Sequence, residues 1–474
     1  MKIGVIGVGY VGLVQGVILA HHGMDVICLD KDVNKINALQ NGMIPIYEPG
    51  LEELITINRD ADRLTFATNT QKVIEESDVI IIAVGTPPLA DGNADISKII
   101  EVAESIGKYS NRYKCIVIKS TVPVGTGDVV KSVIHEVIQG RGLFIDFDMV
   151  SNPEFLREGK AIQDCEHPDR IVIGIENERA KEVMQRMYKD FIDNNIPLLF
   201  TNITTSEMIK YASNAFLAVK LSFINEMALL AEKVGGNIQD IAQGMGMDSR
   251  ISPQFLQAGA GYGGSCFPKD TKAIVETGKK YGEEMFVIDA AIRANEKQKL
   301  KMVDKVIQHM NGVRGKTLGI LGLSFKPDTD DIRDAPAIDI IKGLIHAGGN
   351  IQAYCPYGMK AAKEKLQTFD DKIKYCNNAY EALDLSDAVV LVTEWKEFLD
   401  LDFMRIHNSM TDHYFFDLRN QFYGRNDVRK KFTYIPVGHG EDRVKYKENI
   451  IQYDFNGLVH MQTHTHLKEN VKTL

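Results

Sequence analysis

A cysteine, a lysine and an aspartate lie close together in a glycine-rich stretch of the chain. Residues 259–270 read GAGYGGSCFPKD, so Cys266 follows four glycines and precedes Lys269 and Asp270. Glycine lets the backbone adopt positive φ and approach a ligand closely. Nearby positive charge favours the thiolate, the nucleophilic form of cysteine. The stretch predicts a reactive cysteine in a binding loop; the alternative is a flexible surface loop with an idle thiol.

A second group of polar side chains lies on a long predicted helix, residues 204–234. Glu207, Lys210 and Asn214 are spaced i, i+3 and i+7 in a run that is otherwise mostly apolar or small. A lysine and an asparagine on a buried helix need polar partners. The stripe is therefore either a surface face at the start of the helix or a functional face that points inward.

Two carboxylates and two threonines complete the candidate set. Glu154 and Glu158 are four residues apart in the segment 152–159, so they share one face if that segment is helical. Such a face usually meets solvent, and it becomes functional only if it lines a crevice. Thr86 and Thr121 follow predicted strands, where ordinary turn and N-cap chemistry is the alternative to ligand binding.

The first thirty residues read as a strand, a glycine-rich turn, a helix and a second strand that ends at an acid. The turn is GVGYVG at 7–12, and Asp30 ends the second strand. The glycines let a pyrophosphate approach, the helix N-terminus attracts its charge, and Asp30 can accept from a ribose hydroxyl. Because a carboxylate would repel a 2′-phosphate, the pattern predicts NAD rather than NADP. The predicted contacts are Gly7, Gly9, Tyr10, Val11, Gly12 and Asp30.

These residues must be positioned by elements that alternate between strand and helix in both halves of the chain. We expect an α/β protein with two Rossmann-like, doubly wound parallel-sheet domains, joined by a long central helix and a helical middle domain. The helix at 204–234 would be about 45 Å long. It has capping-box spacing at Thr204–Glu207, and Gly235 is placed to end it. The predicted units are 1–203, 204–310, 311–450 and a tail at 451–474.

The second α/β half lacks features that bind NAD. It has no G-x-G-x-x-G turn, and Pro356 stands where the first half has Asp30. We therefore expect it to hold a different nucleotide or part of the substrate. Lys326 and Arg419, which follow predicted strands, are candidate ligands for phosphate or hydroxyl groups.

The composition excludes several classes of protein. The 474 residues are 44% hydrophobic and 25% charged, which is ordinary globular usage. The net charge of -9, without a long basic run, argues against nucleic acid as a partner. Six scattered cysteines without a C-x-x-C pair indicate a reducing compartment, and we expect the cytoplasm. No signal peptide, membrane span or metal site is expected, since His464 and His466 alone are too few ligands.

Together the motifs resemble the UDP-glucose/GDP-mannose dehydrogenase family of nucleotide-sugar 6-dehydrogenases, from Gly7 to about Val437. The carriers of this resemblance are GVGYVG at 7–12, GTP at 85–87, STVPVGT at 120–126, NPEFLREG at 152–159, GGSCFPKD at 263–270 and FKPDTDDIR at 325–333.

The resemblance implies a four-electron oxidation of a sugar alcohol to a carboxylate, with two NAD reduced. The implied reaction converts UDP-glucose to UDP-glucuronate, and Cys266 holds the intermediates as a thiohemiacetal and a thioester. The alternative is another nucleotide sugar, such as UDP-N-acetylmannosamine or GDP-mannose; residues 255–259 and 330–336 favour UDP-glucose. A single-step 3-hydroxyacid dehydrogenase would have no use for Cys266 or the second half. An NAD-sensing interaction protein would have no reason to keep Cys266, Lys210 and Asp270.

The resemblance also assigns catalytic roles. Lys210 stabilises negative charge on the reacting oxygen, and Asp270 assists proton transfer. Asn214 donates to the same oxygen. Glu154 and Thr121 position the water that hydrolyses the thioester.

Further positions are implied to contact the cofactor or the substrate. The implied cofactor contacts are Lys35, Thr86, Thr121, Glu158, Lys269 and Arg333. The implied substrate contacts are Glu154, Phe155, Leu156, Arg157, Lys210, Asn214, Arg250, Phe255, Leu256, Gln257, Ala258, Gly259, Gly263, Lys326 and Arg419. Arg250 would reach the substrate of a neighbouring subunit, and the long apolar helix predicts a homodimer or a higher homo-oligomer.

Overall fold

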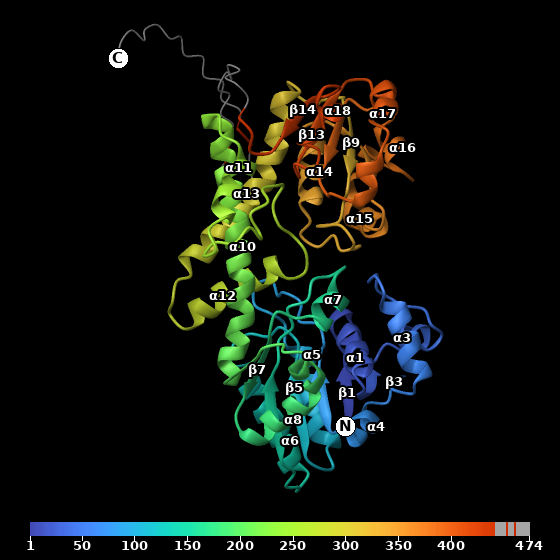
Figure 1. Ribbon diagram of the computed structural model, residues 1–474, viewed down its shortest axis with the longest axis vertical. Helices are drawn as coiled ribbons and strands as arrows, with labels where there is room; N and C mark the ends of the chain where they lie inside the picture. The colour runs from blue at the N-terminus through green and yellow to red at the C-terminus, as the bar shows by residue number, and fades with distance from the viewer. Residues whose placement is uncertain (441–451, 454–458, 461–474) are drawn as a thin grey trace.

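The structure is a computed structural model that describes residues 1–440, 452–453 and 459–460. Two α/β units lie at opposite ends of the molecule, and helix α10 (Ile203–Val234) runs along one side and connects them (Figure 1). Most of the predicted tail at 451–474, including His464 and His466, lies outside the described residues. Only β15 (Gln452–Tyr453) and β16 (Val459–His460) are described there.

The first unit contains an eight-stranded sheet in the order β3-β2-β1-β4-β5-β6-β7-β8. The strands are β1 (Lys2–Ile6), β2 (Asp25–Leu29), β3 (Leu64–Ala67), β4 (Val79–Ile82), β5 (Lys114–Ile118), β6 (Phe147–Ser151), β7 (Ile171–Ile175) and β8 (Leu198–Thr201). The predicted parallel sheet is confirmed, with β6–β7 as one antiparallel pair. The strand order reverses at β1, and ligands of such sheets bind beyond the carboxyl ends of the strands at that point.

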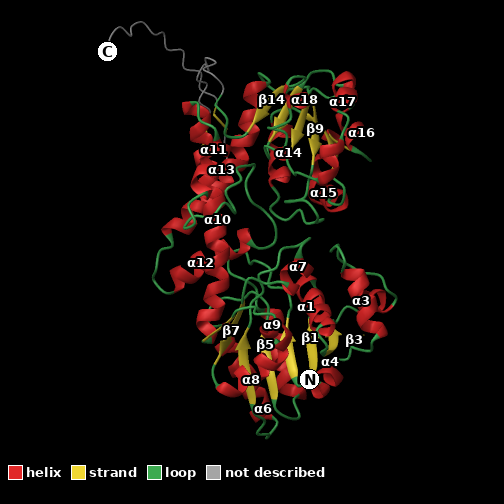
Figure 2. Cartoon of the chain, in the orientation of Figure 1, coloured by secondary structure: helices red, strands yellow, loops and turns green. Residues whose placement is uncertain are grey.

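Helices cover both faces of this sheet (Figure 2). They are α1 (Tyr10–His21), α2 (Val33–Gln40), α3 (Leu51–Asp60), α4 (Thr70–Glu76), α5 (Ser97–Tyr109), α6 (Thr126–Gly140), α7 (Ala161–Glu166), α8 (Glu178–Met187) and α9 (Lys189–Asp193). The four residues of β4 are buried and alternate between two apolar clusters. Val79 and Ile81 pack into one, Ile80 and Ile82 into the other. Because side chains of a strand alternate in direction, continuous apolar strands produce a sheet with a core on each face.

The helical middle part consists of α10, α11 (Ile238–Gly246), α12 (Phe267–Lys280) and α13 (Phe286–His309). Gly235 ends α10 in the left-handed conformation, as predicted. The predicted capping box at Thr204–Glu207 is wrong, because Asn202 is the N-cap and its side chain accepts from the amide three residues on. Glu207 instead accepts from the amides of Gly125 and Gly127 at 2.7 and 2.8 Å, which ties α10 to the start of α6.

Helix α10 is long and apolar enough to cross a membrane by length and composition, with a mean hydropathy of 1.3 in its most apolar window. It packs against α12, α13 and β7, however, and it carries the buried polar side chains Glu207, Lys210 and Asn214. This is the packing of a core helix rather than of a membrane span.

The second unit repeats the strand order of the first around a six-stranded parallel sheet, β11-β10-β9-β12-β13-β14. Its strands are β9 (Thr317–Leu321), β10 (Asn350–Tyr354), β11 (Ile373–Tyr375), β12 (Ala388–Leu391), β13 (Tyr414–Asp417) and β14 (Thr433–Pro436). Its helices are α14 (Pro336–His346), α15 (Met359–Leu366), η1 (Gln367–Lys372), α16 (Ala379–Leu383), η2 (Lys396–Asp400), α17 (Phe403–Ser409) and α18 (Asn426–Arg429). The predicted second Rossmann-like half is confirmed.

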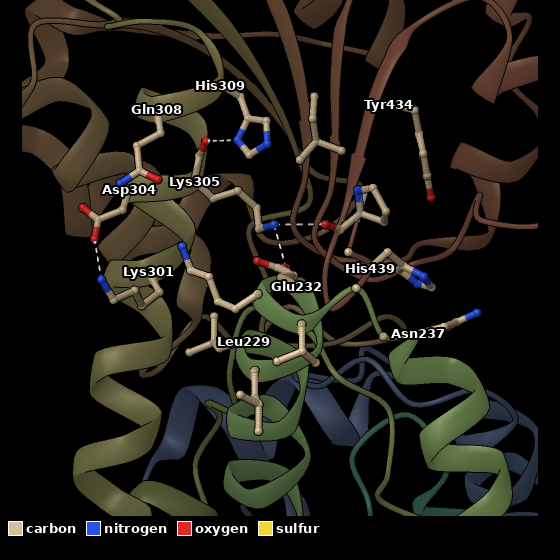
Figure 3. Close-up of a pocket in the computed structure, with 18 of the residues that line it drawn as sticks. Leu229, Glu232, Asn237, Lys301, Asp304, Lys305, Gln308, His309, Tyr434 and His439 are labelled. Atoms are coloured by element: carbon tan, nitrogen blue, oxygen red, sulfur yellow. Dashed lines mark hydrogen bonds and ion pairs between the residues drawn. The ribbon is translucent and has the colours of Figure 1, made fainter. Parts of the chain in front are cut away.

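The far end of α10 is fastened to the second unit. Glu232 accepts from Lys305 Nζ on α13 and from the Gly438 amide, both at 2.7 Å (Figure 3). Asn237 and His439 form an antiparallel bridge. The chain that leaves β14 is therefore held against the end of α10.

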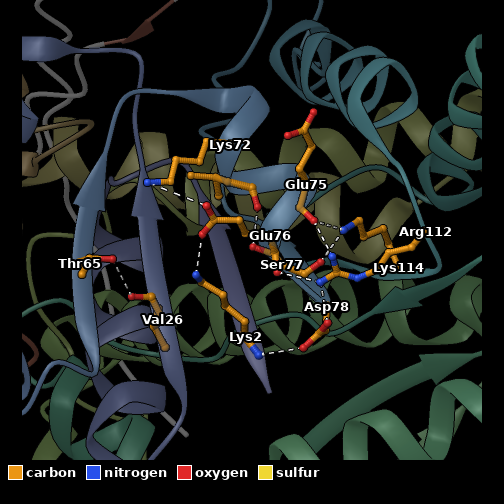
Figure 4. A network of polar contacts seen from close by, with 11 residues as sticks. Lys2, Val26, Thr65, Lys72, Glu75, Glu76, Ser77, Asp78, Arg112 and Lys114 are labelled. Carbon is orange, nitrogen blue, oxygen red and sulfur yellow. Dashed lines mark hydrogen bonds and ion pairs between the residues drawn. The ribbon is translucent and has the colours of Figure 1, made fainter.

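Polar contacts also join the amino ends of the central strands of the first sheet (Figure 4). Lys2 donates through its amide to Asp78 at 3.0 Å and through Nζ to Glu76 at 2.6 Å. Arg112 also donates to Asp78, at 3.0 Å. Lys114 is buried and donates to the carbonyl of Ser77 at 2.6 Å, and burial lowers the pKa of its ammonium to about 8. These contacts join the amino ends of the central strands, and the carboxyl ends of the strands remain for ligands.

Candidate active site

Cys266 is the N-cap of α12, at the point where the glycine-rich loop becomes helix. A helix N-terminus carries partial positive charge, which favours a thiolate. Burial raises the pKa of the Cys266 thiol, and the charge of Lys210 opposes that rise. The hydroxyl of Ser265 lies 3.5 Å from the sulfur. Cys266 is therefore held where local charge can stabilise its anion.

The loop before Cys266 owes its path to glycine. Gly261 and Gly264 have φ of 114° and 88°, which side chains with a Cβ rarely adopt. A Cβ on Gly263 would lie 2.3 Å from the carbonyl oxygen of Asp334. The Gly264 amide donates to the Arg333 carbonyl at 2.7 Å. The loop thus packs directly against the backbone of the second α/β unit.

Lys210 and Glu154 form a buried ion pair. Lys210 Nζ donates to Glu154 Oε1 at 2.9 Å and to the Glu154 carbonyl at 2.6 Å, and their side chains are only 4% and 7% exposed. Burial alone would lower the pKa of Lys210, but Glu154, Cys266 and Asp270 outweigh it and raise that pKa. The inward-facing interpretation of the stripe agrees with this geometry, and Lys210 is a cation beside the thiol.

The segment 152–159 is not helical, so the premise that Glu154 and Glu158 share a helix face is wrong. Glu154 turns toward Lys210, whereas Glu158 turns toward the second unit. Glu158 accepts from the hydroxyls of Ser265 and Thr329 at 3.1 and 3.2 Å. The two carboxylates therefore contact different residues, Glu154 in the first pair and Glu158 at the second unit.

Asn214 and Asp270 form a second buried pair, in which Asn214 Nδ2 donates to Asp270 Oδ2 at 2.6 Å. Lys269 Nζ donates to the other oxygen of Asp270, also at 2.6 Å. The charge of Lys269 is thus directed to Asp270, and the cation that lowers the pKa of Cys266 is Lys210. Helices α10 and α12 thus bring two polar pairs to one cysteine.

Sequence reasoning missed a buried lysine that stands behind these pairs. Lys119 follows β5 and donates to Asn152 Oδ1 at 3.1 Å and to Tyr188 Oη at 3.4 Å. Burial lowers the pKa of Lys119 to about 8. Lys119 lies two residues before Thr121, and Asn152 two residues before Glu154. The signal was available, because a lysine that continues an apolar strand needs a partner inside the fold.

Replacing Lys119 with methionine gives a prediction in which stability depends on pH. Between pH 8 and 10.5 the folded wild type binds fewer protons at this position than the unfolded chain, so its stability rises with pH. Over this pH range the free energy of unfolding of the wild type should rise by about 3 kcal/mol relative to that of Lys119→Met. Thermal melts of both proteins from pH 7 to 10.5 test this, since the shared groups cancel in the difference. A difference in midpoint that stays constant across this range would contradict the buried titration.

The glycine turn after β1 is shaped to receive a nucleotide. Gly7 has φ of 100°, and a Cβ on Gly12 would lie 1.9 Å from the Gly7 carbonyl oxygen. A Cβ on Gly9 would meet open space, and no side chain caps α1 there. The amides at the start of α1 therefore face a cradle, which fits the pyrophosphate of NAD.

Asp30 lies at the carboxyl end of β2, beside this cradle. Its Oδ2 accepts from the Val8 amide at 3.0 Å and from Lys35 Nζ at 2.9 Å. Burial would raise the pKa of Asp30, but the bonds from the Asp32 amide, Lys35 and Val8 outweigh burial and lower that pKa. Asp30 is therefore an ionised acceptor, as a ribose hydroxyl requires.

Further candidates line the space between the two units. A cavity of about 360 Å³ is bordered by Tyr10, Glu158 and Arg333. Arg333 lies 3.5 Å from Glu158 and 2.7 Å from Asp331. Burial raises the pKa of Glu158. The cofactor end of the first sheet thus faces residues of the second unit.

The predicted strand-end threonines are also brought together. Thr86 Oγ1 donates to the Thr121 carbonyl at 2.8 Å, which joins the segments after β4 and β5. This is a structural role for the Thr86 hydroxyl, and it places both residues at the edge where ligands bind.

The residues predicted to contact substrate fall into two groups. Gly259 is buried, with its amide donating to Asn225 at 2.8 Å, and its missing Cβ would lie 3.2 Å from an Arg419 nitrogen. Arg419 donates to the carbonyls of Val392 and Phe325 at 2.8 and 3.2 Å. Burial lowers the pKa of Lys326. The segment 255–259 and the second unit therefore meet at Gly259 and Arg419.

Two other predicted contacts, Arg157 and Arg250, pair with carboxylates outside this assembly in a single chain. The Arg250 side chain is 87% exposed and pairs with Asp248. Arg157 pairs with Asp164 at 2.6 Å. Phe155 lies under the guanidinium of Arg170, 3.8 Å from the ring centre. Leu256, Ala258 and Gly263 are buried, Phe255 is half-buried, and Gln257 is exposed.

Known proteins are similar to this chain in both α/β units and in the helical middle part. Three models of the UDP-glucose/GDP-mannose dehydrogenase family match the chain: the NAD binding domain at residues 1–192, the central domain at 204–297 and the UDP binding domain at 319–423.

Individual relatives are similar over nearly their whole length. The UDP-glucose 6-dehydrogenase of Rhizobium meliloti is 47% identical over 443 residues, which are 92% of this chain and 99% of that protein. The structure of a UDP-glucose dehydrogenase from the archaeon Pyrobaculum islandicum is 35% identical, with a TM-score of 0.85, and covers 93% of this chain and 98% of its own. The structure of UDP-D-ManNAc dehydrogenase from Pyrococcus horikoshii is 25% identical, with a TM-score of 0.80, over 93% of this chain and all of its own.

Proposed function

Since the chain belongs to the UDP-glucose/GDP-mannose dehydrogenase family, we propose that it oxidises UDP-glucose to UDP-glucuronate with NAD. The relatives with the higher identities bear names that specify UDP-glucose, and residues 255–259 and 330–336 favour the same sugar. The observation that carries the proposal is the convergence of Lys210–Glu154 and Asn214–Asp270 on Cys266.

The first oxidation requires stabilisation of negative charge and removal of a proton. Lys210 and Asn214 stabilise charge that develops on the C6 oxygen, and Asp270 receives its proton. NAD held by Gly7, Gly9, Gly12 and Asp30 supplies the hydride acceptor, one molecule for each oxidation.

The second oxidation depends on the sulfur of Cys266. The thiolate adds to the aldehyde carbon, forming a C6–S bond, and the new alkoxide takes up a proton to give a thiohemiacetal. That carbon then loses its hydrogen as hydride and its hydroxyl oxygen loses a proton, which gives a thioester. Water positioned by Glu154 and Thr121 then adds to C6, the C6–S bond breaks, and the carboxylate and the thiol are released.

A panel of nucleotide sugars tests this proposal. Purified protein is incubated with NAD and with UDP-glucose, UDP-N-acetylmannosamine or GDP-mannose, and NADH is followed at 340 nm as kcat/KM. We expect UDP-glucose to exceed both alternatives by at least roughly tenfold, the scale of about 1.4 kcal/mol of selective binding. Faster turnover of either alternative would contradict the assignment of UDP-glucose.

We also propose a homodimer through one face of α10. Five large apolar side chains on this helix are exposed, and their spacings of eight, seven, seven and four residues place them on one side. They are Met208, Phe216, Phe223, Leu230 and Val234, with 43–72% of each exposed. A monomer rarely leaves such a continuous apolar face in water. The same pairing would let the exposed Arg250 reach the neighbouring subunit.

The dimer is tested by placing charge on that face. The double variant Phe216→Glu/Phe223→Glu is expected to sediment as a monomer, because charges at the centre of an apolar interface cannot be solvated. Met404→Glu, an exposed apolar residue of α17, is the control and should leave the state unchanged. An unchanged sedimentation coefficient in the double variant would exclude this face as the interface.

The remaining assignments follow from the same reasoning. We propose the functional units 1–203, 204–310 and 311–450, with the catalytic cysteine loop in the middle unit. The six cysteines are all free thiols, which supports a reducing compartment and hence the cytoplasm.

A further inference from the structure

The glycine loop, residues 259–264, is buried although it belongs to no helix or strand. It leads directly to Cys266 at the start of α12. Irregular segments usually run over the surface, where water pairs with their backbone groups. A buried segment must find partners for these groups inside the protein. The glycine loop therefore needs donors and acceptors from the elements around it.

Helix α13 supplies such partners through two amide side chains. Asn295 Oδ1 accepts from the Tyr262 amide at 2.8 Å, and Asn295 Nδ2 donates to the Tyr262 carbonyl at 3.0 Å. Gln298 Nε2 donates to the Gly259 carbonyl at 2.7 Å. Asn295 and Gln298 are three residues apart, so they are neighbours on one face of α13. One helix face thus pairs with the loop at two places.

Helix α10 supplies the remaining partner. Asn225 Oδ1 accepts from the Gly259 amide at 2.8 Å. Ser222, one turn earlier on α10, donates to the Ala291 carbonyl of α13 at 2.7 Å, which joins the two helices beside the loop. The backbone amide and carbonyl of Gly259 are therefore both paired, as those of Tyr262 are.

The three amide side chains, Asn225, Asn295 and Gln298, are at most 3% exposed. An amide side chain has both a donor and an acceptor, so Asn295 pairs with Tyr262 as a residue of a neighbouring strand would. A buried polar group that loses its partner costs more than the pair contributes. If the loop left this path, these three side chains would lose their partners together.

The loop approaches α13 closely because it contains glycine. A Cβ on Gly261 would lie 2.9 Å from Asn295 Oδ1 and 3.5 Å from Lys299 Cγ. The first distance is shorter than a carbon and an oxygen tolerate, so a larger residue would push the loop away from its amide partners. The glycine and the amides of α13 therefore depend on each other.

We propose that Asn225, Asn295 and Gln298 form an amide clamp, which holds residues 259–264 in the shape that receives the nucleotide sugar and directs Cys266 toward it. They are positioning residues, which act on the substrate through the loop. This inference rests on the proposed function, because it takes the loop as part of the substrate site. A loop that is fixed before binding loses less conformational freedom when the substrate arrives.

Asn295→Leu tests the clamp, because leucine has a similar shape and forms no side-chain hydrogen bond. The matched control is Asn58→Leu on α3 of the first unit. Asn58 is also buried, donates to the Leu54 carbonyl at 2.8 Å and accepts from Arg63 at 3.1 Å. Gln298→Met removes a single donor of the clamp, and it carries the same prediction if Asn295→Leu does not fold.

Two measurements are made on the full chain. Steady-state kinetics gives the KM for NAD and the KM for the nucleotide sugar that the wild type oxidises fastest. Hydrogen exchange with mass spectrometry follows the backbone amides of residues 259–264 without any substrate. A wrong assignment of the sugar would appear in the wild type, whereas a wrong assignment of the clamp would appear only in the comparison of variant with wild type.

We expect the clamp variant to raise the KM for the nucleotide sugar at least about tenfold, the effect of one buried hydrogen bond. The loop amides should exchange at least about tenfold faster. The KM for NAD should stay close to that of the wild type, and Asn58→Leu should lower the melting temperature without changing either KM. Unchanged exchange of the loop, or an equal rise of both KM values, would overturn the proposal.

Discussion

Cys266→Ser is expected to lower the rate of UDP-glucuronate formation by roughly 10³-fold or more, the scale of losing a covalent nucleophile. Serine at the start of α12 lacks an ionised form at neutral pH, because the helix N-terminus and Lys210 stabilise a thiolate but cannot ionise an alcohol of much higher pKa. Chromatography of the sugar nucleotides after long incubation measures the loss. The first oxidation, from alcohol to aldehyde, does not need the sulfur. Sugar held at the aldehyde level can therefore still form in this variant.

The specificity of this effect is checked with a second thiol. Cys165 is half-buried and belongs to the first unit, and Cys165→Ser should form the acid at nearly the wild-type rate. Acid formation by Cys266→Ser at the rate of the control would remove Cys266 from the mechanism.

Lys210→Met is expected to lower kcat by about 10²- to 10³-fold, because a donor to the developing oxyanion is lost. The same change leaves Glu154 buried without its cation, which should cost about 3–5 kcal/mol of stability. We therefore expect a lower kcat in steady-state kinetics and a lower melting temperature in thermal melts.

The double variant Lys210→Met/Glu154→Gln separates these two effects. Removing the charge of Glu154 should restore much of the melting temperature, since no unpaired buried ion remains. Activity should stay low. Recovery of kcat together with stability would show that Lys210 acts only through folding.

Much of the fold could be predicted because its signals are local. Continuous apolar strands, the turn at 7–12 and the length of α10 are patterns of neighbouring residues, and each appears in the structure. Strands β3 and β8 are only four residues long and partly exposed, so their apolar runs are too short to mark them clearly. The antiparallel pairing of β6 with β7 depends on how residues 152–170 turn, which no periodicity encodes.

The candidate site could be predicted only in part, for the same reason. Cys266 and Asp270 share one stretch, and the spacing of Lys210 and Asn214 showed that they share a face. Their partners are 56 residues away in sequence. The pairing of Lys269 with Asp270, by contrast, joins neighbouring residues.

The stoichiometry of NADH tests the central claim most directly. A limiting, known amount of UDP-glucose is consumed completely with excess NAD, and the final absorbance at 340 nm gives NADH per sugar. If Cys266 retains the aldehyde for a second oxidation, two NADH form for each UDP-glucose. A value of one, with the aldehyde released, would contradict the account.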